Sequence, residues 1–216
     1  MEHVQNVLSI STQSTSSRWV PSSQDVIDLW AHLSEKYRTE TIDKHDSDFM
    51  AFIGRVLSIS PGMTRQDFID NYVTVIGRKI YAPFEPGTPG ENSWGLWSQM
   101  IVCAHEHQHV AQYKAHDVRG LVGFSTQYLT KKARRTRFEI EAYTTALEMH
   151  FWRTGTVLDT GPILRSLVAY RVGDLDLKVA KNALDANNGM IARGAVITEA
   201  GAETIKWLRD RGIDPR

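Results

Sequence analysis

Three histidines within five residues constrain this chain of 216 residues more than any other feature. The segment Val102–Val110 reads VCAHEHQHV and contains the pattern His-Glu-x-x-His at His105, Glu106 and His109. On a helix, residues four apart lie one above the other, so the two histidines can present their imidazoles to one Zn²⁺ ion. Glu106, turned by about 100°, would lie beside the metal. The flanking residues are largely apolar, which predicts a helix over about 94–114 whose polar side chains need partners, and not an ordinary charged surface helix.

This motif resembles that of the zincin metallopeptidases, and the resemblance covers roughly Tyr72 to Trp152. In that superfamily a strand precedes the motif helix, and a third protein ligand comes from a later element. The metzincin subclass continues as His-x-x-Gly-x-x-His, but this chain has Gln112 and Ala115 at the Gly and His positions. The resemblance is therefore to the gluzincin-type arrangement, which takes a Glu from a downstream helix.

Two downstream glutamates could serve as that ligand, both on a predicted helix over about 134–152. Glu139 shares a helical face with mostly small and apolar residues, whereas Glu141 shares a face with polar ones. The polar set is Thr144, Thr145 and Glu148. A buried carboxylate must be paired or bound to a metal, so we expect Glu139 on the core side as the ligand and Glu141 as its solvated neighbour.

The resemblance implies a hydrolase, namely a zinc-dependent metallopeptidase. His105, His109 and Glu139 would bind Zn²⁺ and leave a fourth position for water. Glu106 would remove a proton from the zinc-bound water as that water attacks a peptide carbonyl, and would then pass the proton to the leaving amine.

Two tyrosines are candidates for the donor that stabilises the oxyanion, namely Tyr143 and Tyr128. Glu139-x-x-Ala142 resembles the Glu-x-x-Ala-Asp signature of several gluzincin-like families. Tyr143 stands where those families carry an Asp of the second coordination shell, so the sequence shows no obvious partner to orient the ligand histidines.

The remaining histidines and the lone cysteine have plainer interpretations. His107 lies some 200° around the helix from His105, which predicts a surface role or a second-shell contact. His116 and His150 are expected to be packing or solvated residues. Cys103 is expected to be a small core residue, and a single cysteine cannot form an intrachain disulfide.

The rest of the chain predicts an α+β domain, mostly helical with a small sheet before the motif helix, and the resemblance implies that this fold is zincin-like. Apolar residues recur at helical intervals in several segments. These segments are Ser22–Tyr37, Asp46–Leu57, Thr64–Asn71, Pro162–Tyr170, Asp174–Asn187 and Thr198–Arg211. Tyr72–Ile76 and Ile80–Ala82 are β-branched and aromatic runs about Gly77 and predict a hairpin. A Ser/Thr-rich start predicts a flexible arm over 1–20, ahead of a single domain over 21–216.

The hairpin suggests how a substrate would be held. Zincin-like peptidases place an edge strand beside the motif helix, so that an extended peptide can pair with it. We expect Ile80–Ala82, or its partner Val73–Ile76, to border the metal site with one edge unpaired. The loop FEPGTPG that follows would form a rim of the cleft.

Charge and composition exclude several other classes of function. Lys+Arg and Asp+Glu number 25 each, so the chain lacks the basic excess of nucleic-acid binders. The basic run Lys131–Arg137 is expected to be a solvated loop or to recognise an acidic partner. No apolar run approaches the roughly 20 residues that span a bilayer, and no secretory signal is evident. We expect a soluble protein, cytoplasmic or within a virion or other assembly, that takes a peptide or protein substrate and binds neither nucleic acid nor membrane.

Two alternatives share the same metal site. The protein could be a zincin-fold structural or interaction protein of a larger assembly, for example a phage particle, with a vestigial or stabilising metal. Retention of Glu106 argues against this, as does the count of three ligands where a structural zinc usually has four. A zinc hydrolase acting on a non-peptide bond would differ only in its substrate.

Overall fold

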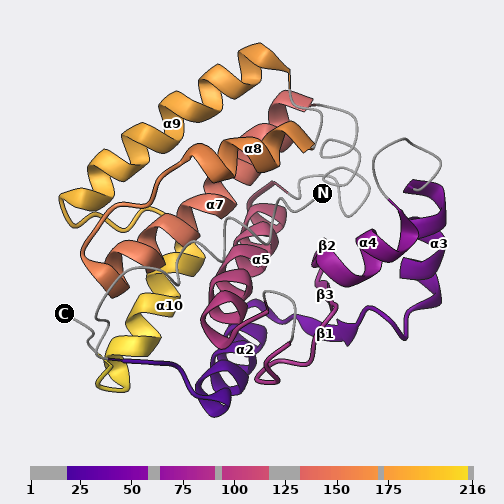
Figure 1. The fold of residues 1–216 in the computed structure, drawn as a ribbon. Coiled ribbons are helices and arrows are strands. Elements are labelled where there is room, and N and C mark those ends of the chain that lie inside the picture. Colours follow the sequence, from indigo (N-terminus) through magenta and orange to yellow (C-terminus); the bar gives the residue numbers. More distant parts are fainter. Residues whose placement is uncertain (1–18, 58–63, 91–93, 117–131, 170–172, 214–216) are drawn as a thin grey trace.

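The computed structural model describes residues 19–57, 64–90, 94–116, 132–169 and 173–213 (Figure 1). This part of the chain is mostly helical with one small sheet, which confirms the expected α+β class. In chain order the elements are α2 (Ser23–Tyr37), β1 (Glu40–Asp43), α3 (Asp48–Leu57), α4 (Arg65–Asn71), β2 (Thr74–Ile76), β3 (Lys79–Ala82), α5 (Leu96–His116), α7 (Lys132–Thr154), α8 (Gly161–Ala169), α9 (Asp174–Ala192) and α10 (Glu199–Asp210). Within it, no helix is both long and apolar enough to cross a membrane.

Local sequence signals set the start of α2. The Ser22 hydroxyl accepts from the Asp25 N–H at 3.2 Å, and the Asp25 carboxylate accepts from the Ser22 N–H at 2.8 Å. This reciprocal pair satisfies N–H groups that the first turn of a helix leaves without partners. The helix ends at Arg38, whose φ of 57° is left-handed. Its buried face is the predicted one, with Val26, Leu29, Trp30, Leu33 and Tyr37.

The sheet has three strands in the order β1-β3-β2. The antiparallel pair of β2 and β3 is the predicted hairpin, with Thr74 opposite Tyr81 and a turn at Gly77, whose φ is 64°. The parallel strand β1, with Thr41 opposite Ile80, was not predicted. Because β3 is paired on both sides, the expectation that the 80–82 run offers a free edge is wrong. Among the strands that the structure describes, β2 pairs with β3 alone.

A buried lysine links this sheet to α4 through hydrogen bonds. Lys44 follows β1, and its Nζ donates to the carbonyls of Phe68 and Tyr72, both at 2.7 Å, and to the Thr74 hydroxyl at 3.0 Å. The ammonium also lies 3.6 Å from the centre of the Phe68 ring. These contacts satisfy all three donors of the amine, so a fully buried lysine is tolerated here.

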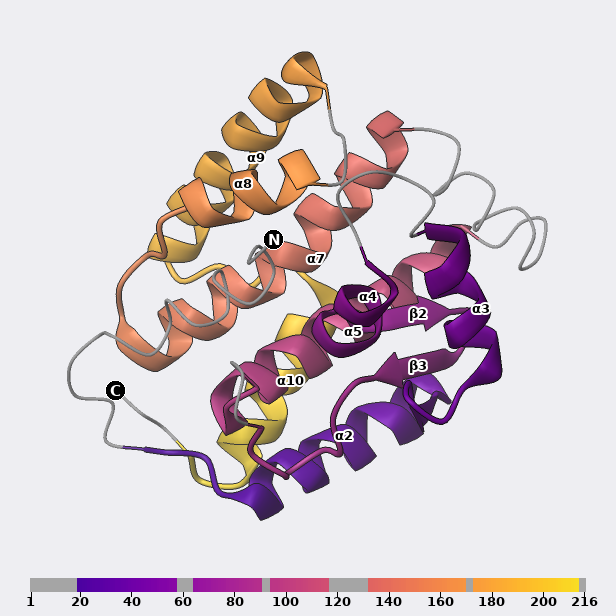
Figure 2. The same ribbon diagram turned by 45° about the vertical axis from the view of Figure 1, so that its right-hand side comes forward.

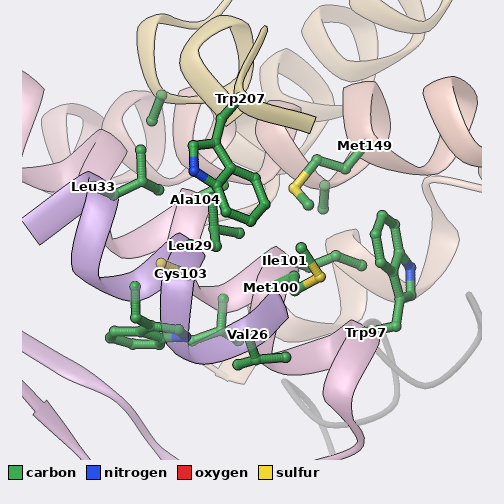
Figure 3. Close-up of a cluster of buried hydrophobic side chains, with 14 of the residues drawn as sticks. Val26, Leu29, Leu33, Trp97, Met100, Ile101, Cys103, Ala104, Met149 and Trp207 are labelled. Carbon is green, nitrogen blue, oxygen red and sulfur yellow. The ribbon is translucent and has the colours of Figure 1, made fainter. Parts of the chain in front are cut away.

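The motif helix α5 occupies the middle of the fold, where α2, α7 and α10 pack against it (Figure 2). One side chain from each of these helices illustrates the main apolar cluster: Leu29, Ala104, Met149 and Trp207 come from α2, α5, α7 and α10 respectively (Figure 3). Cys103 is fully buried in this cluster, as predicted. A helix buried on several sides leaves its polar residues in the interior, where they must find partners.

A second apolar cluster lies between α7, α8 and α9, the last two being C-terminal helices that the sequence predicted. Its buried members are Ile140, Tyr143, Leu147, Leu158, Ile163, Leu167, Ala180, Leu184 and Ile191. The basic run expected as a loop instead forms the first turns of α7, from Lys132 onward. The predicted arm over 1–20 lies outside the described residues up to position 18. The Trp19 ring packs edge-on against Trp97 and Trp152, at centroid distances of 6.2 and 6.4 Å.

Candidate metal centre

Helix α5 brings His105 and His109 together as the spacing predicts. Their ring centroids are 4.9 Å apart, with the ring planes at 81°. The two side chains keep a small exposed fraction, 13% and 10% respectively. Burial lowers the pKa of His105 well below its usual value, and the neighbouring His109 lowers it further. A neutral imidazole is the form that binds a metal.

Glu139 reaches across from α7 to face both rings. Its Oε2 lies 3.9 Å from His105 Nε2, and its Oε1 lies 3.7 Å from His109 Nε2. One ligand atom from each of the three residues lies within 4.8 Å of the others. Both nitrogen–oxygen distances are too long for hydrogen bonds between these atoms. A tetrahedral zinc with bonds of about 2.0–2.1 Å separates its ligand atoms by about 3.4 Å, so the two nitrogen–oxygen pairs would close by a few tenths of an ångström, and the widest pair of ligand atoms by up to about 1.4 Å, on binding zinc.

Glu139, not Glu141, faces the two histidines, as the helical-face argument predicts. Glu141 is half-buried, and its Oε1 accepts from the Gln108 amide at 2.7 Å. The Oε1 of Gln108 in turn accepts from the Ala200 N–H of α10 at 2.9 Å. Gln108 therefore ties the motif helix to both α7 and α10.

Glu141 was expected to be solvated but is half-buried, and the polar face that it shares packs against other helices. Thr144, Thr145 and Glu148 are buried because α9 and α10 cover them. The Thr144 hydroxyl accepts from the Asn187 amide at 2.9 Å, and the Glu148 carboxylate accepts from the N–H of Thr198 at 2.9 Å. Polar residues can form a buried helix face when another element supplies hydrogen-bond partners.

Glu106 lies one residue beyond His105 on α5 and is 8% exposed. In the metal-free protein, burial raises the pKa of its carboxyl group to about 7. The nearby His109 lowers this pKa, Glu139 raises it, and the ammonium of Lys44 lowers it. Glu106 is thus a buried carboxyl group beside the three residues that could hold a metal, and the buried side chain of Lys44 lies near it.

Gln112, one turn after His109, supplies a contact that the sequence reasoning missed. Its Oε1 lies 2.9 Å from His109 Nδ1, and its Nε2 donates to the Phe138 carbonyl at 2.9 Å. The sequence reasoning considered this position only as the place of an absent glycine. The three-residue spacing from His109 on one helix was the available signal.

Tyr143 packs against the site, with its ring centroid 4.9 Å from that of His105 and the planes at 68°. Its hydroxyl is hydrogen-bonded to Ser166 of α8, and the side chain is 2% exposed. As the molecule stands, the ring supports His105 while the hydroxyl is engaged elsewhere. Tyr128, the other predicted oxyanion donor, lies outside the described residues.

Three further histidines were considered from the sequence: His107, His116 and His150. His107 is fully buried, where a surface or second-shell role was expected: its Nε2 lies 3.0 Å from the Thr39 hydroxyl and its Nδ1 2.7 Å from the Cys103 carbonyl. The sequence could not foresee that α2 and the segment after it cover this side of α5. His150 is a buried packing residue, as predicted, and the side chain of His116 lies outside the described residues.

The start of β2 lies close to the centre. The strand contacts α5, and Lys44, whose charge acts on Glu106, donates to Tyr72 and Thr74 at its beginning. The position of the loop FEPGTPG as a rim of the site stays a prediction. Its Gly87, with a φ of 87°, donates its N–H to Gln99 at 2.9 Å, six residues before His105 and so about 9 Å along the helix.

Comparison of the chain with protein-family models, with curated proteins and with solved structures finds no match in any of the three.

Proposed function

We propose that the protein is a zinc-dependent metallopeptidase. One observation carries the proposal: Glu106 lies buried on the same helix as His105 and His109, and Glu139 completes a set of three residues close enough to hold a metal. Catalytic zinc sites have three protein ligands and an open position, whereas structural sites have four. In the part of the chain that the structure describes, the cluster contains these three residues and no fourth.

The chemistry follows from the types of residue present. His105, His109 and Glu139 would hold the metal, and zinc in such a site acts as a Lewis acid that polarises a carbonyl and lowers the pKa of water. Glu106 would take the proton from the attacking water and deliver it to the amine that leaves. Tyr143 would donate to the oxyanion only by exchanging its hydrogen bond with Ser166 for one to the substrate.

Strand β2 supports a peptide as substrate. It pairs with β3 along one side, and among the described strands none pairs with its other side. An extended peptide could add there, with its backbone N–H and C=O groups pairing with those of Thr74–Ile76. Lys44 would hold the start of this edge in place through Tyr72 and Thr74.

The test compares wild type with Glu106→Gln and His105→Ala for zinc content and for cleavage of an unfolded, fluorescence-quenched protein. We expect wild type to bind about one zinc per chain and to cleave the substrate. Glu106→Gln should keep its zinc and lose at least about 100-fold in rate, because general acid–base catalysis contributes roughly that much or more. His105→Ala should lose both zinc and activity.

Three outcomes would contradict the proposal. Full activity of Glu106→Gln would show that this carboxylate is not the base. Zinc retained by His105→Ala would place the metal elsewhere. Stoichiometric zinc in wild type without cleavage of any peptide would favour a stabilising metal in a structural protein.

A further inference from the structure

We infer that Gln112 is a positioning residue of the metal centre, which fixes the ring of His109 and holds α5 at its distance from α7. This inference rests on the proposed metal site and deepens it. No resemblance or motif assigned a role to this side chain. The role of Gln112 is inferred from its two hydrogen bonds, to His109 and to Phe138.

The two bonds determine which way the Gln112 amide faces. The Phe138 carbonyl can only accept, so the group 2.9 Å from it must be the NH₂ of the amide. The oxygen of the amide then faces His109 Nδ1 at 2.9 Å. Both ends of the side chain are engaged, and the residue is 2% exposed.

The amide in turn determines the tautomer of His109. An oxygen can only accept, so Nδ1 must carry the hydrogen, and in the neutral ring Nε2 then keeps its lone pair. Nε2 is the atom that lies 3.7 Å from the Glu139 carboxylate. Gln112 thereby presents to the metal the nitrogen that the donor set requires.

The same side chain links the two helices that carry the ligands. His109 belongs to α5, and Phe138 immediately precedes Glu139 on α7. Loss of Gln112 would free the ring on one helix and leave a buried carbonyl on the other without this donor. Loss of such an outer contact typically weakens metal binding by about 10- to 100-fold.

Gln99 provides a matched control on the same helix. It is also fully buried, and it accepts from the Gly87 N–H and donates to the Thr88 and Trp94 carbonyls. None of these partners is a residue of the metal centre. Gln99→Leu should therefore reduce the stability of the protein without weakening zinc binding in the folded state.

The experiment measures the zinc dissociation constant by competition with a chromophoric chelator for wild type, Gln112→Leu, Gln112→Glu and Gln99→Leu. We expect Gln112→Leu to bind zinc about 10- to 100-fold more weakly than wild type. Gln112→Glu keeps an oxygen that accepts from Nδ1 and should recover part of this loss. Equal affinity of Gln112→Leu and wild type would overturn the inference.

A second measurement uses the unmodified, metal-free protein, so it does not depend on how the variants fold. The ¹⁵N chemical shifts of the His109 ring should show hydrogen on Nδ1, and hydrogen on Nε2 instead would overturn the role of Gln112. Failure of the proposed function looks different, because wild type would then bind no zinc, or bind zinc without cleaving any peptide, although the tautomer is as expected.

Discussion

The substitution Gly201→Ala should destabilise the protein, although alanine is the better helix former. Gly201 lies in the first turn of α10, and a Cβ built there would overlap Glu148 Oε2 and Thr198 Oγ1. That carboxylate accepts from the N–H groups of Ile197 and Thr198 and from the Thr198 hydroxyl, which itself accepts from the Gly201 N–H at 3.1 Å. The methyl group therefore displaces a buried charge and the helix cap together.

The magnitude follows from the bonds that must yield. A hydrogen bond to a charged group contributes about 1.5–3 kcal/mol, and a helix N-cap contributes about 1 kcal/mol. Alanine recovers about 1 kcal/mol through its helix propensity. The cap and the propensity cancel, so if one or two of these bonds are lost we expect the free energy of unfolding to fall by about 1.5–6 kcal/mol.

The assay is urea unfolding followed by circular dichroism, with Gly189→Ala as the control. Gly189 is also within a helix, but a Cβ there would meet only the Arg193 guanidinium, at 3.8 Å. Gly189→Ala should therefore raise the free energy of unfolding by about 0.5–1 kcal/mol. The reasoning is refuted if both variants are stabilised alike.

Two further predictions concern the site and the lysine near it. Glu139→Ala should lose zinc, measured by elemental analysis after dialysis. Glu141→Ala removes a hydrogen bond to Gln108 but should keep zinc. The reverse pattern would identify Glu141 as the ligand. Burial lowers the pKa of Lys44 to about 7, whereas the pKa of a lysine in an unfolded chain is about 10.4. Between these two pH values the unfolded chain therefore binds more protons than the folded protein. Relative to Lys44→Met, the free energy of unfolding of wild type should then rise between about pH 7 and pH 10, by up to about 1.4 kcal/mol per pH unit. Parallel profiles of unfolding free energy against pH for the two proteins would contradict this.

Features that depend on neighbours in the sequence were predictable, and those that depend on distant segments were not. The capping box at Ser22 and the spacing of His105 and His109 are local, so helical geometry was enough to place them. The burial of Glu139, which faces the two histidines, also followed, because an apolar helix face indicates burial whatever covers it.

The errors share one physical cause. Strand β1 is short and half-exposed, so its sequence carries no periodic pattern. It pairs in parallel with β3, where Thr41 lies opposite Ile80, 39 residues further along the chain. The burial of Thr144, Glu148 and His107 was not foreseen either, because the partners of these polar residues come from α9, α10 and the segment after α2. Sequence patterns report the polarity of a residue, not whether a remote donor will satisfy it.

The two positions that the His-Glu-x-x-His pattern leaves open are not open in this molecule. His107 hydrogen-bonds with Thr39, and Gln108 bridges Glu141 and the Ala200 N–H. Each of these two positions thus makes a tertiary contact. Fewer residue types are therefore tolerated within the motif of this protein than its consensus allows. A substitution at either open position keeps the pattern recognisable and still removes a contact that holds the helix in place. Descendants of this sequence would be expected to vary at these positions only together with changes in α2, α7 or α10.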